Sequence, residues 1–168
     1  YMLDYHSGEI SDHPFSSEWY EWLTDKRPVL DAFTYISEEN SVSTISTFGN
    51  PLLLLVGLAA VLHNIQLWRI KGCRTARTLV TAYLAMLMPW MFIHRAVFIY
   101  QYFVCIIILI VLICNSLVNM KKTSRNGLVL LGASLVLFIL FFPVISGAEA
   151  DREFVSKCLE WLPTWQFE

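Results

Sequence analysis

The chain has 168 residues, of which 56% are hydrophobic and 15% are charged, and its net charge is -2. Soluble domains are typically about 45–50% apolar and about 25% charged, so this composition excludes an ordinary soluble domain and indicates a protein that lies in lipid. Nucleic-acid binding has no support, because membrane topology explains where the basic residues lie.

Residues 1–50 are polar and acidic, and we expect them to form an outer, extracytoplasmic loop region. The chain opens with Tyr1, so we expect it to be part of a longer protein. Within the loop region the segment 13–28, HPFSSEWYEWLTDKRP, combines aromatic and charged side chains. Ser16 or Ser17 is expected to cap a short helix there.

The aromatic side chains of this segment have two interpretations. The residues concerned are Trp19, Tyr20 and Trp22, bracketed by His13 and Arg27. Trp and Tyr favour the membrane interface, so an aromatic belt is one interpretation. Sugars also stack on these rings, so a carbohydrate surface is the other, and composition alone does not separate them.

Four apolar stretches are long enough to cross a hydrocarbon layer of about 30 Å. They cover approximately residues 51–69, 79–99, 102–119 and 128–146. Asn50 can cap the first stretch, and Pro51 fits its first helical turn. We therefore predict an all-α integral membrane fold with a four-helix transmembrane region over 51–147.

The charged residues predict how the spans are oriented. Nine acids lie in 1–50 and five in 148–168, which accounts for all fourteen. The basic residues gather in two loops, with Arg69, Lys71, Arg74 and Arg77 in one and Lys121, Lys122 and Arg125 in the other. The positive-inside rule makes these loops cytoplasmic and places both ends of the chain outside the cell membrane. A soluble four-helix bundle is excluded, because a stretch such as CIIILIVLIC has no polar face.

Residues 148–168 are predicted to form an outer amphipathic tail. Its apolar side chains would lay a short helix along the lipid headgroups: Phe154, Leu159, Trp161, Leu162 and Trp165. The four cysteines show no CxxC or Cys/His spacing, so no metal site is expected in this segment, although the metal requirement of the whole protein stays open.

Arg95 is the one charged residue that enters the predicted spans. It lies near the outer end of 79–99, beyond Pro89, which should kink that helix. Helical side chains lean toward the N-terminus, so on a helix that runs outward Arg95 would lean back into the membrane. We expect it to hold a lipid phosphate through two parallel hydrogen bonds; snorkelling to the headgroups is the alternative. His94 beside it is more typical of an interfacial residue.

Four motifs follow one another along the chain. They are YHSGEISDHPFSSEWYEWLTDKRPV, FGNP, LMPWMFIHRAVFIYQYF and WLPTWQF. In this order they resemble the loop YHs…HPYSSpWYeWP…RPi, the GNP, the LPW…R..FiYHYf region and the usual C-terminal end of bacterial protein O-mannosyltransferases. The resemblance covers nearly the whole chain and corresponds to the C-terminal four-span region of these dolichyl- or polyprenyl-phosphate-mannose–protein mannosyltransferases.

The resemblance implies a type C glycosyltransferase (GT-C fold). Such enzymes move mannose from a polyprenyl-phosphate lipid to Ser or Thr of an exported acceptor protein. The catalytic acids of the family lie in its first outer loop, far upstream, so no catalytic residue is expected here and the segment alone should be inactive. The implied partners are the lipid-linked donor, the acceptor protein, the N-terminal part of the same enzyme and membrane lipids, and no cofactor beyond the donor is evident.

The resemblance also implies a set of donor-binding residues. They are Arg95, Tyr102, His13, Ser16, Trp19, Tyr20, Trp22 and Arg27. Three positions depart from the family pattern: Leu23 replaces a proline, Phe15 replaces a tyrosine, and Gln101 replaces the histidine of YHY. The last change removes any proton transfer at that position.

A non-catalytic membrane protein of similar ancestry, which binds lipid carriers or assists assembly, is the alternative. A small transporter or channel fits poorly, because one charged residue enters the spans and no polar pore lining is evident.

Overall fold

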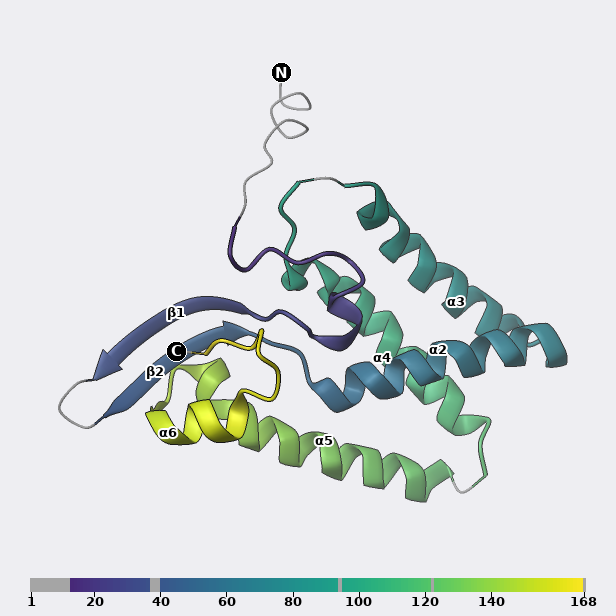
Figure 1. Cartoon of the computed structure of the whole chain (residues 1–168). Coiled ribbons are helices and arrows are strands. Elements are labelled where there is room, and N and C mark those ends of the chain that lie inside the picture. The colour runs from purple at the N-terminus through teal and green to yellow at the C-terminus, as the bar shows by residue number, and fades with distance from the viewer. Residues whose placement is uncertain (1–12, 37–39, 94, 122, 168) are drawn as a thin grey trace.

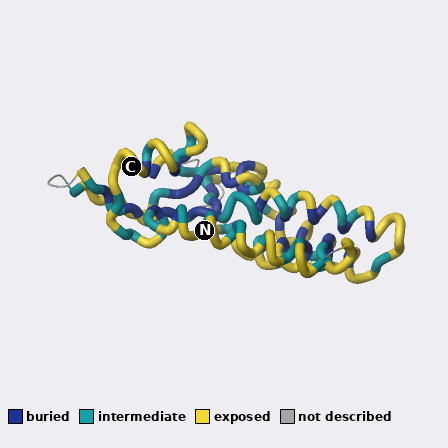
Figure 2. Tube along the Cα trace, turned by 90° about the horizontal axis from the view of Figure 1, so that it is seen from below, coloured by how far each residue is buried: buried dark blue, intermediate teal, exposed yellow. Residues whose placement is uncertain are grey.

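The computed structural model describes residues 13–36, 40–93, 95–121 and 123–167. The protein is mostly helical, with a helical bundle at one end and a lobe that contains a β-sheet at the other (Figure 1). Buried residues run through the interior of the bundle, whereas the outward faces of its helices are exposed along their length (Figure 2).

The first membrane helix begins and ends as the sequence indicates. Helix α2 (Pro51–Lys71) is capped by Asn50, whose side chain accepts the Leu53 N–H at 3.3 Å, and Pro51 occupies its first position. The helix stops at Gly72, whose φ of 64° lies in the left-handed region that glycine adopts without strain.

The predicted helix over 79–99 is wrong in its second half. Helix α3 (Arg74–Leu87) ends where the tight 3-10 turn η2 (Met88–Phe92) begins, and of the predicted residues beyond it, Ile93 and 95–98 are not helical. Pro89 explains this end, since a proline has no N–H to continue the ladder and its ring blocks the preceding turn. Helix α3 and η2 together are about 31 Å long. Both would therefore be needed to cross the hydrocarbon layer of about 30 Å at this point.

Three helical segments among the described residues are long and apolar enough to cross a membrane. They are α2, the segment Ile99–Val118 formed by η3 (Ile99–Tyr102) and α4 (Phe103–Val118), and α5 (Thr123–Ser146). Helices α2 and α4 are closely packed, and α3 lies against both. Helix α5 leaves this group and runs to the sheet lobe, where Phe141 and Val144 are buried (Figure 1).

The all-α prediction is wrong for the outer region, which contains a three-stranded antiparallel sheet. Strands β1 (Val29–Ile36) and β2 (Ser41–Thr47) are adjacent, and β3 (Glu149–Asp151) pairs with the other edge of β2. The strand sequences VLDAFTYI and SVSTIST are rich in β-branched and aromatic residues, which favour a pleated surface.

The tail differs in part from the prediction of a helix along the headgroups. Its described residues form strand β3 and then a short helical stretch, in which α6 (Arg152–Phe154) continues as the π-helix η4 (Val155–Leu159). Leu159 and Trp165 are buried in the protein, beside Phe48. Because β3 fastens the start of the tail to β2, the rest folds back over the sheet and the end of α5. The other three apolar side chains of that prediction stay exposed: Phe154, Trp161 and Leu162.

Candidate functional site

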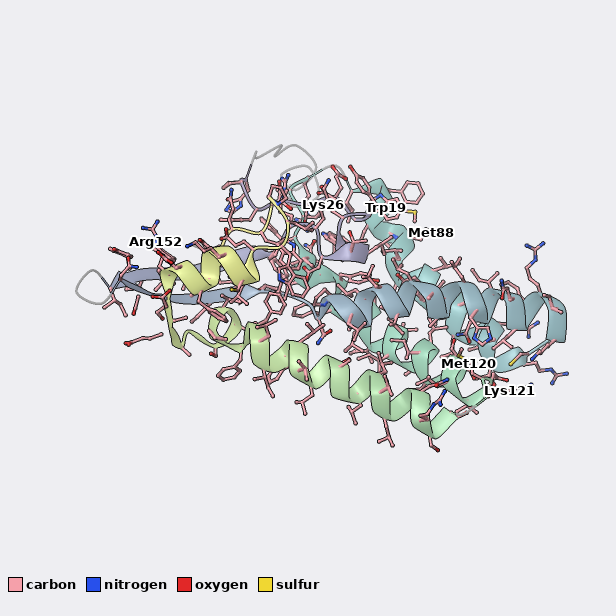
Figure 3. All side chains as sticks on the ribbon, turned by 60° about the horizontal axis from the view of Figure 1, so that its bottom comes forward. Trp19, Lys26, Met88, Met120, Lys121 and Arg152 are labelled. Carbon is pink, nitrogen blue, oxygen red and sulfur yellow. The ribbon has the colours of Figure 1, made fainter. Side chains whose placement is uncertain are left out.

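Two segments that are far apart in the sequence meet at the end of the bundle opposite Lys121 (Figure 3). Residues 13–28 pack on residues 88–102, and we call the surface that they form together the rim. The Ser17 N–H donates to the Val97 carbonyl at 2.9 Å. Trp19, Lys26 and Met88 lie on the same side of the molecule, away from Lys121 at the opposite end of the bundle (Figure 3).

Trp22 is the anchor of the first segment. It lies in the 3-10 turn η1 (Trp22–Thr24) and is 0% exposed. Its ring centroid is 5.7 Å from that of Trp90 and 6.3 Å from that of Tyr102. The indole N–H donates to the Ser17 hydroxyl at 2.8 Å, so Ser17 supports a side chain and does not cap the expected helix.

Tyr102 is equally buried, and its hydroxyl lies 2.6 Å from that of Tyr83 on α3. Neither Trp22 nor Tyr102 has exposed surface to offer a ligand. In this arrangement the two side chains join the rim to α3 and α4, so they hold the rim in place and do not line its surface.

The exposed face of the rim carries other members of the expected set. His13 and Tyr20 are exposed, and Trp19 is half-buried with its ring 5.7 Å from that of Tyr20. The His13 imidazole meets the Phe98 ring edge-on at 5.1 Å. Phe98 in turn stacks on Tyr100 at 5.5 Å. The result is an exposed surface of aromatic rings and one imidazole.

Arg95 is exposed at a bend between η2 and η3. The expectation that it leans back into the membrane is wrong, because that argument needs a helix and the helix has ended before Pro89. Its guanidinium belongs to the same non-helical stretch that carries Val97 and Phe98 onto the rim. His94 lies outside the described residues.

The remaining basic residues of the first segment fix its shape. Arg27 donates to the carbonyl of Ser16 at 3.0 Å and is half-buried. Lys26 donates to Glu21 at 2.8 Å. Burial alone would raise the pKa of Glu21, but the hydrogen bonds from Lys26 and from the Glu18 N–H outweigh it and lower that pKa. Glu21 is therefore a charged partner for Lys26 at neutral pH.

Asp25 follows η1 and joins the first segment to Gly49, just before α2. Nothing in the sequence indicated a special role for it. One carboxyl oxygen accepts the Gly49 N–H at 2.7 Å, while the other is buried and has no hydrogen-bond partner in the part of the chain that the structure describes. Burial raises its pKa to about 8, so the carboxyl is neutral at pH 7.

The C-terminal tail reaches the same turn. The Trp165 indole N–H donates to the Asp25 carbonyl at 2.7 Å, and the Thr164 hydroxyl donates to that of Lys26. The motifs at the two ends of the sequence are thus in direct contact. From the sequence alone, the WLPTWQF motif indicates only the C-terminal end of the family pattern. Its hydrogen bonds to residues 25 and 26 show that it supports the rim.

Comparison with known families decides what this arrangement belongs to. The family model described as the C-terminal four TMM region of protein-O-mannosyltransferase matches residues 1–165. The chain belongs to this protein-O-mannosyltransferase family. No curated protein and no solved structure matches.

Membership of the mannosyltransferase family confirms the resemblance drawn from the motifs and places the chain in a glycosyltransferase context. The motifs HPFSSEWYEW and RAVFIYQY, which carried that resemblance, are the two that meet at the rim. Among the described residues, no group of three or more His, Cys, Asp or Glu side chains is placed to hold a metal ion. The chemistry that the rim offers comes from one exposed guanidinium, an imidazole and aromatic faces.

Proposed function

We propose that this region binds the lipid-linked donor of a protein O-mannosyltransferase, with the rim on the outer side of the membrane. The observation that carries the proposal is the docking of residues 13–28 onto residues 88–102. That contact sets the His13 imidazole against Phe98, and the segment that carries the Trp19–Tyr20 pair beside Val97, which follows Arg95 by two residues.

The transfer needs what such a surface supplies. A Ser or Thr oxygen of the exported acceptor forms a bond to the anomeric carbon of mannose while the bond from that carbon to the phosphate oxygen breaks. The hydroxyl proton goes to a carboxylate base outside this segment, and the electron pair leaves with the polyprenyl phosphate. A guanidinium at the departing oxygen stabilises the charge that develops there.

The residues of the proposed site divide into two roles. Arg95 contacts the lipid phosphate, and the half-buried ring of Trp19 and the exposed ring of Tyr20 pack against the sugar. Trp22 and Tyr102 are positioning residues, because both are fully buried and join the rim to the bundle. Arg27 acts in the same way through the Ser16 carbonyl.

Arg95→Ala in the full enzyme tests the proposal. We expect kcat/KM for the polyprenyl-phosphate-mannose donor to fall by about tenfold or more, since a contact to a charged phosphate is lost, with little change in melting temperature. Arg95→Lys should restore only part of the loss, because an ammonium lacks the two-pronged geometry. The matched control is Arg77→Ala, which removes an exposed arginine at the other end of α3.

Unchanged donor kinetics in Arg95→Ala would remove this arginine from the site. A complete natural protein that binds polyprenyl phosphate but transfers no mannose to any acceptor would replace the proposal with the alternative, a non-catalytic lipid-carrier protein.

A further inference from the structure

A groove inside the membrane-spanning part opens between α4 and α5, beside the start of α2. Its volume is about 260 Å³. The side chains that line it include Leu53 of α2, Ile110, Ile113 and Leu117 of α4, and Gly127 and Leu130 of α5. It lies between three segments that are each apolar and long enough to cross a bilayer.

The groove exists because α5 is pinned to its neighbours at two points and stands away from them in between. The Asn50 side chain donates to the Ser134 carbonyl at 3.0 Å. At the other end, the Thr123 hydroxyl donates to the Leu117 carbonyl at 2.9 Å. Gly127 lies between these points, and a Cβ there would only reach ordinary contact with Leu117, at 3.9 Å. Only 11% of the most apolar stretch of α5 is buried, so the gap stays open to the lipid side.

We propose that this groove holds an acyl chain of an anionic phospholipid from the leaflet next to the α4–α5 turn. A cavity of about 150 Å³ is enough to hold benzene, so about 260 Å³ holds roughly ten chain carbons. A second helix, about 10 Å across, cannot enter a space of this size. The lining contains two polar side chains, Cys114 and Ser134, among aliphatic ones, which is too few to favour a sugar or a peptide.

The preference for an anionic headgroup comes from the turn at the end of the groove. Lys121 is exposed there, four residues after Leu117, and lies at the α4–α5 end of the bundle (Figure 3). The segment 121–125 reads KKTSR, and the sequence has no acid between Glu39 and Glu149. Basic clusters beside membrane helices attract the negatively charged headgroups of anionic lipids.

Photo-crosslinking tests the site in the natural full-length protein reconstituted in bilayers. The probe is phosphatidylglycerol with a photoreactive group in its acyl chain, and the comparison is phosphatidylcholine with the same chain. We expect phosphatidylglycerol to label peptides of α4 and α5 that line the groove about fivefold or more over phosphatidylcholine. Unlabelled phosphatidylglycerol should compete for this labelling.

Two glycines of α5 provide matched variants. Gly127→Leu fills the groove and should lower the labelling about fivefold or more. Gly132→Leu makes the same change on the same helix at a position where a Cβ meets nothing within 4 Å, and its labelling should stay at the wild-type level. Lys121→Gln should reduce the preference for phosphatidylglycerol while leaving the groove open.

Equal labelling by the two lipids, or equal labelling of Gly127→Leu and the wild type, would overturn the proposal. So would displacement of the probe by polyprenyl phosphate in preference to phosphatidylglycerol, which would assign the groove to the carrier lipid. Absence of label on the groove peptides would overturn it as well, because no acyl chain would then occupy the groove.

Discussion

Two fully buried polar side chains, one inside α2 and one beside its start, differ in how completely their hydrogen-bonding groups are paired. Asn64, inside α2, has every hydrogen-bonding group satisfied. Its amide nitrogen donates to the Leu112 carbonyl at 3.0 Å and to the Ser116 hydroxyl at 2.8 Å, and its oxygen accepts from Asn115 at 2.6 Å. This neutral network joins α2 to α4 and does not depend on pH.

Asp25, beside the start of α2, is satisfied only in part. Its carboxyl accepts one hydrogen bond, from Gly49, and its second oxygen is buried without a partner among the described residues. Within lipid no water could form a hydrogen bond to such an unpaired group. A polar side chain between α2 and α4 therefore needs all its hydrogen bonds from the protein, as Asn64 has. At the start of α2, the incompletely paired acid persists because it stays neutral. The turn that carries Asp25 therefore responds to pH, whereas the α2–α4 contact does not.

The largest expected effect is the pH dependence that Asp25 causes. The pKa of an unfolded Asp is about 3.9, and in the folded protein burial raises the pKa of Asp25 to about 8. Between these values the unfolded chain has released the proton and the folded one has kept it. The contribution of Asp25 to the free energy of unfolding should therefore be highest below about pH 4, fall by about 1 kcal/mol per pH unit as pH rises, and level off above about pH 8.

Asp25→Asn should abolish this slope, since an amide keeps an acceptor for the Gly49 N–H and does not ionise. Thermal unfolding of the protein in detergent micelles between pH 5 and pH 9 measures the effect. Asp31→Asn removes an exposed acid of β1 and should keep the wild-type slope. A slope that survives in Asp25→Asn would show that another group controls the pH dependence.

Gly57→Ala should have the next largest effect, because it attacks the α2–α4 contact directly. A Cβ at Gly57 would lie 2.4 Å from two side-chain carbons of Leu109, which is itself buried. Overpacking of this kind costs about 1–3 kcal/mol. A melting-temperature comparison with Gly132→Ala, whose Cβ meets open space, separates the clash from the change in helix propensity. Equal melting temperatures for the two variants would mean that α2 and α4 are not held this closely.

Asn64→Ala should weaken the same contact less, by about 0.6–1.7 kcal/mol, the range found for polar contacts between membrane helices. The loss comes from Asn115 and Ser116, which would keep buried polar atoms with fewer partners. Gln66→Ala is the control, since that residue is exposed on the same helix. A shift in melting temperature no larger than that of the control would contradict a stabilising role for the network.

The membrane helices could be predicted from the sequence because long apolar runs, an Asn–Pro start and a glycine end are local signals. Helix α2 follows them to within two residues of the expected end. The end of α3 could not be placed so well, because whether Pro89 kinks a helix or ends it depends on what replaces the lost hydrogen bond. Here the chain after Phe92 instead packs under residues 13–28, a contact with no local signature.

The sheet lobe was not predicted, because the sequence was expected to give an all-α fold. The high share of β-branched residues in SVSTIST was a usable signal for β2, but β3 is only three residues long and pairs with β2 across more than a hundred residues of sequence. The rim residues were found through motifs. The sequence could not predict which of them are buried. Trp19 and Trp22 belong to the same short run, and only tertiary packing makes Trp22 fully buried and Trp19 half-buried.

The smallest expected effect comes from β2 and has the opposite sign. Ser46 is buried, and its hydroxyl has no hydrogen-bond partner within the described ranges. Ser46→Ala removes that orphan group, so we expect unfolding free energy to stay level or to rise by up to about 1 kcal/mol. Thr44, two residues earlier and also buried, donates to the Phe167 carbonyl at 2.7 Å, so Thr44→Val should instead destabilise by about 1 kcal/mol. If the melting temperatures of both variants move in the same direction, the presence of a hydrogen-bond partner does not decide what a buried hydroxyl contributes to the stability of this lobe.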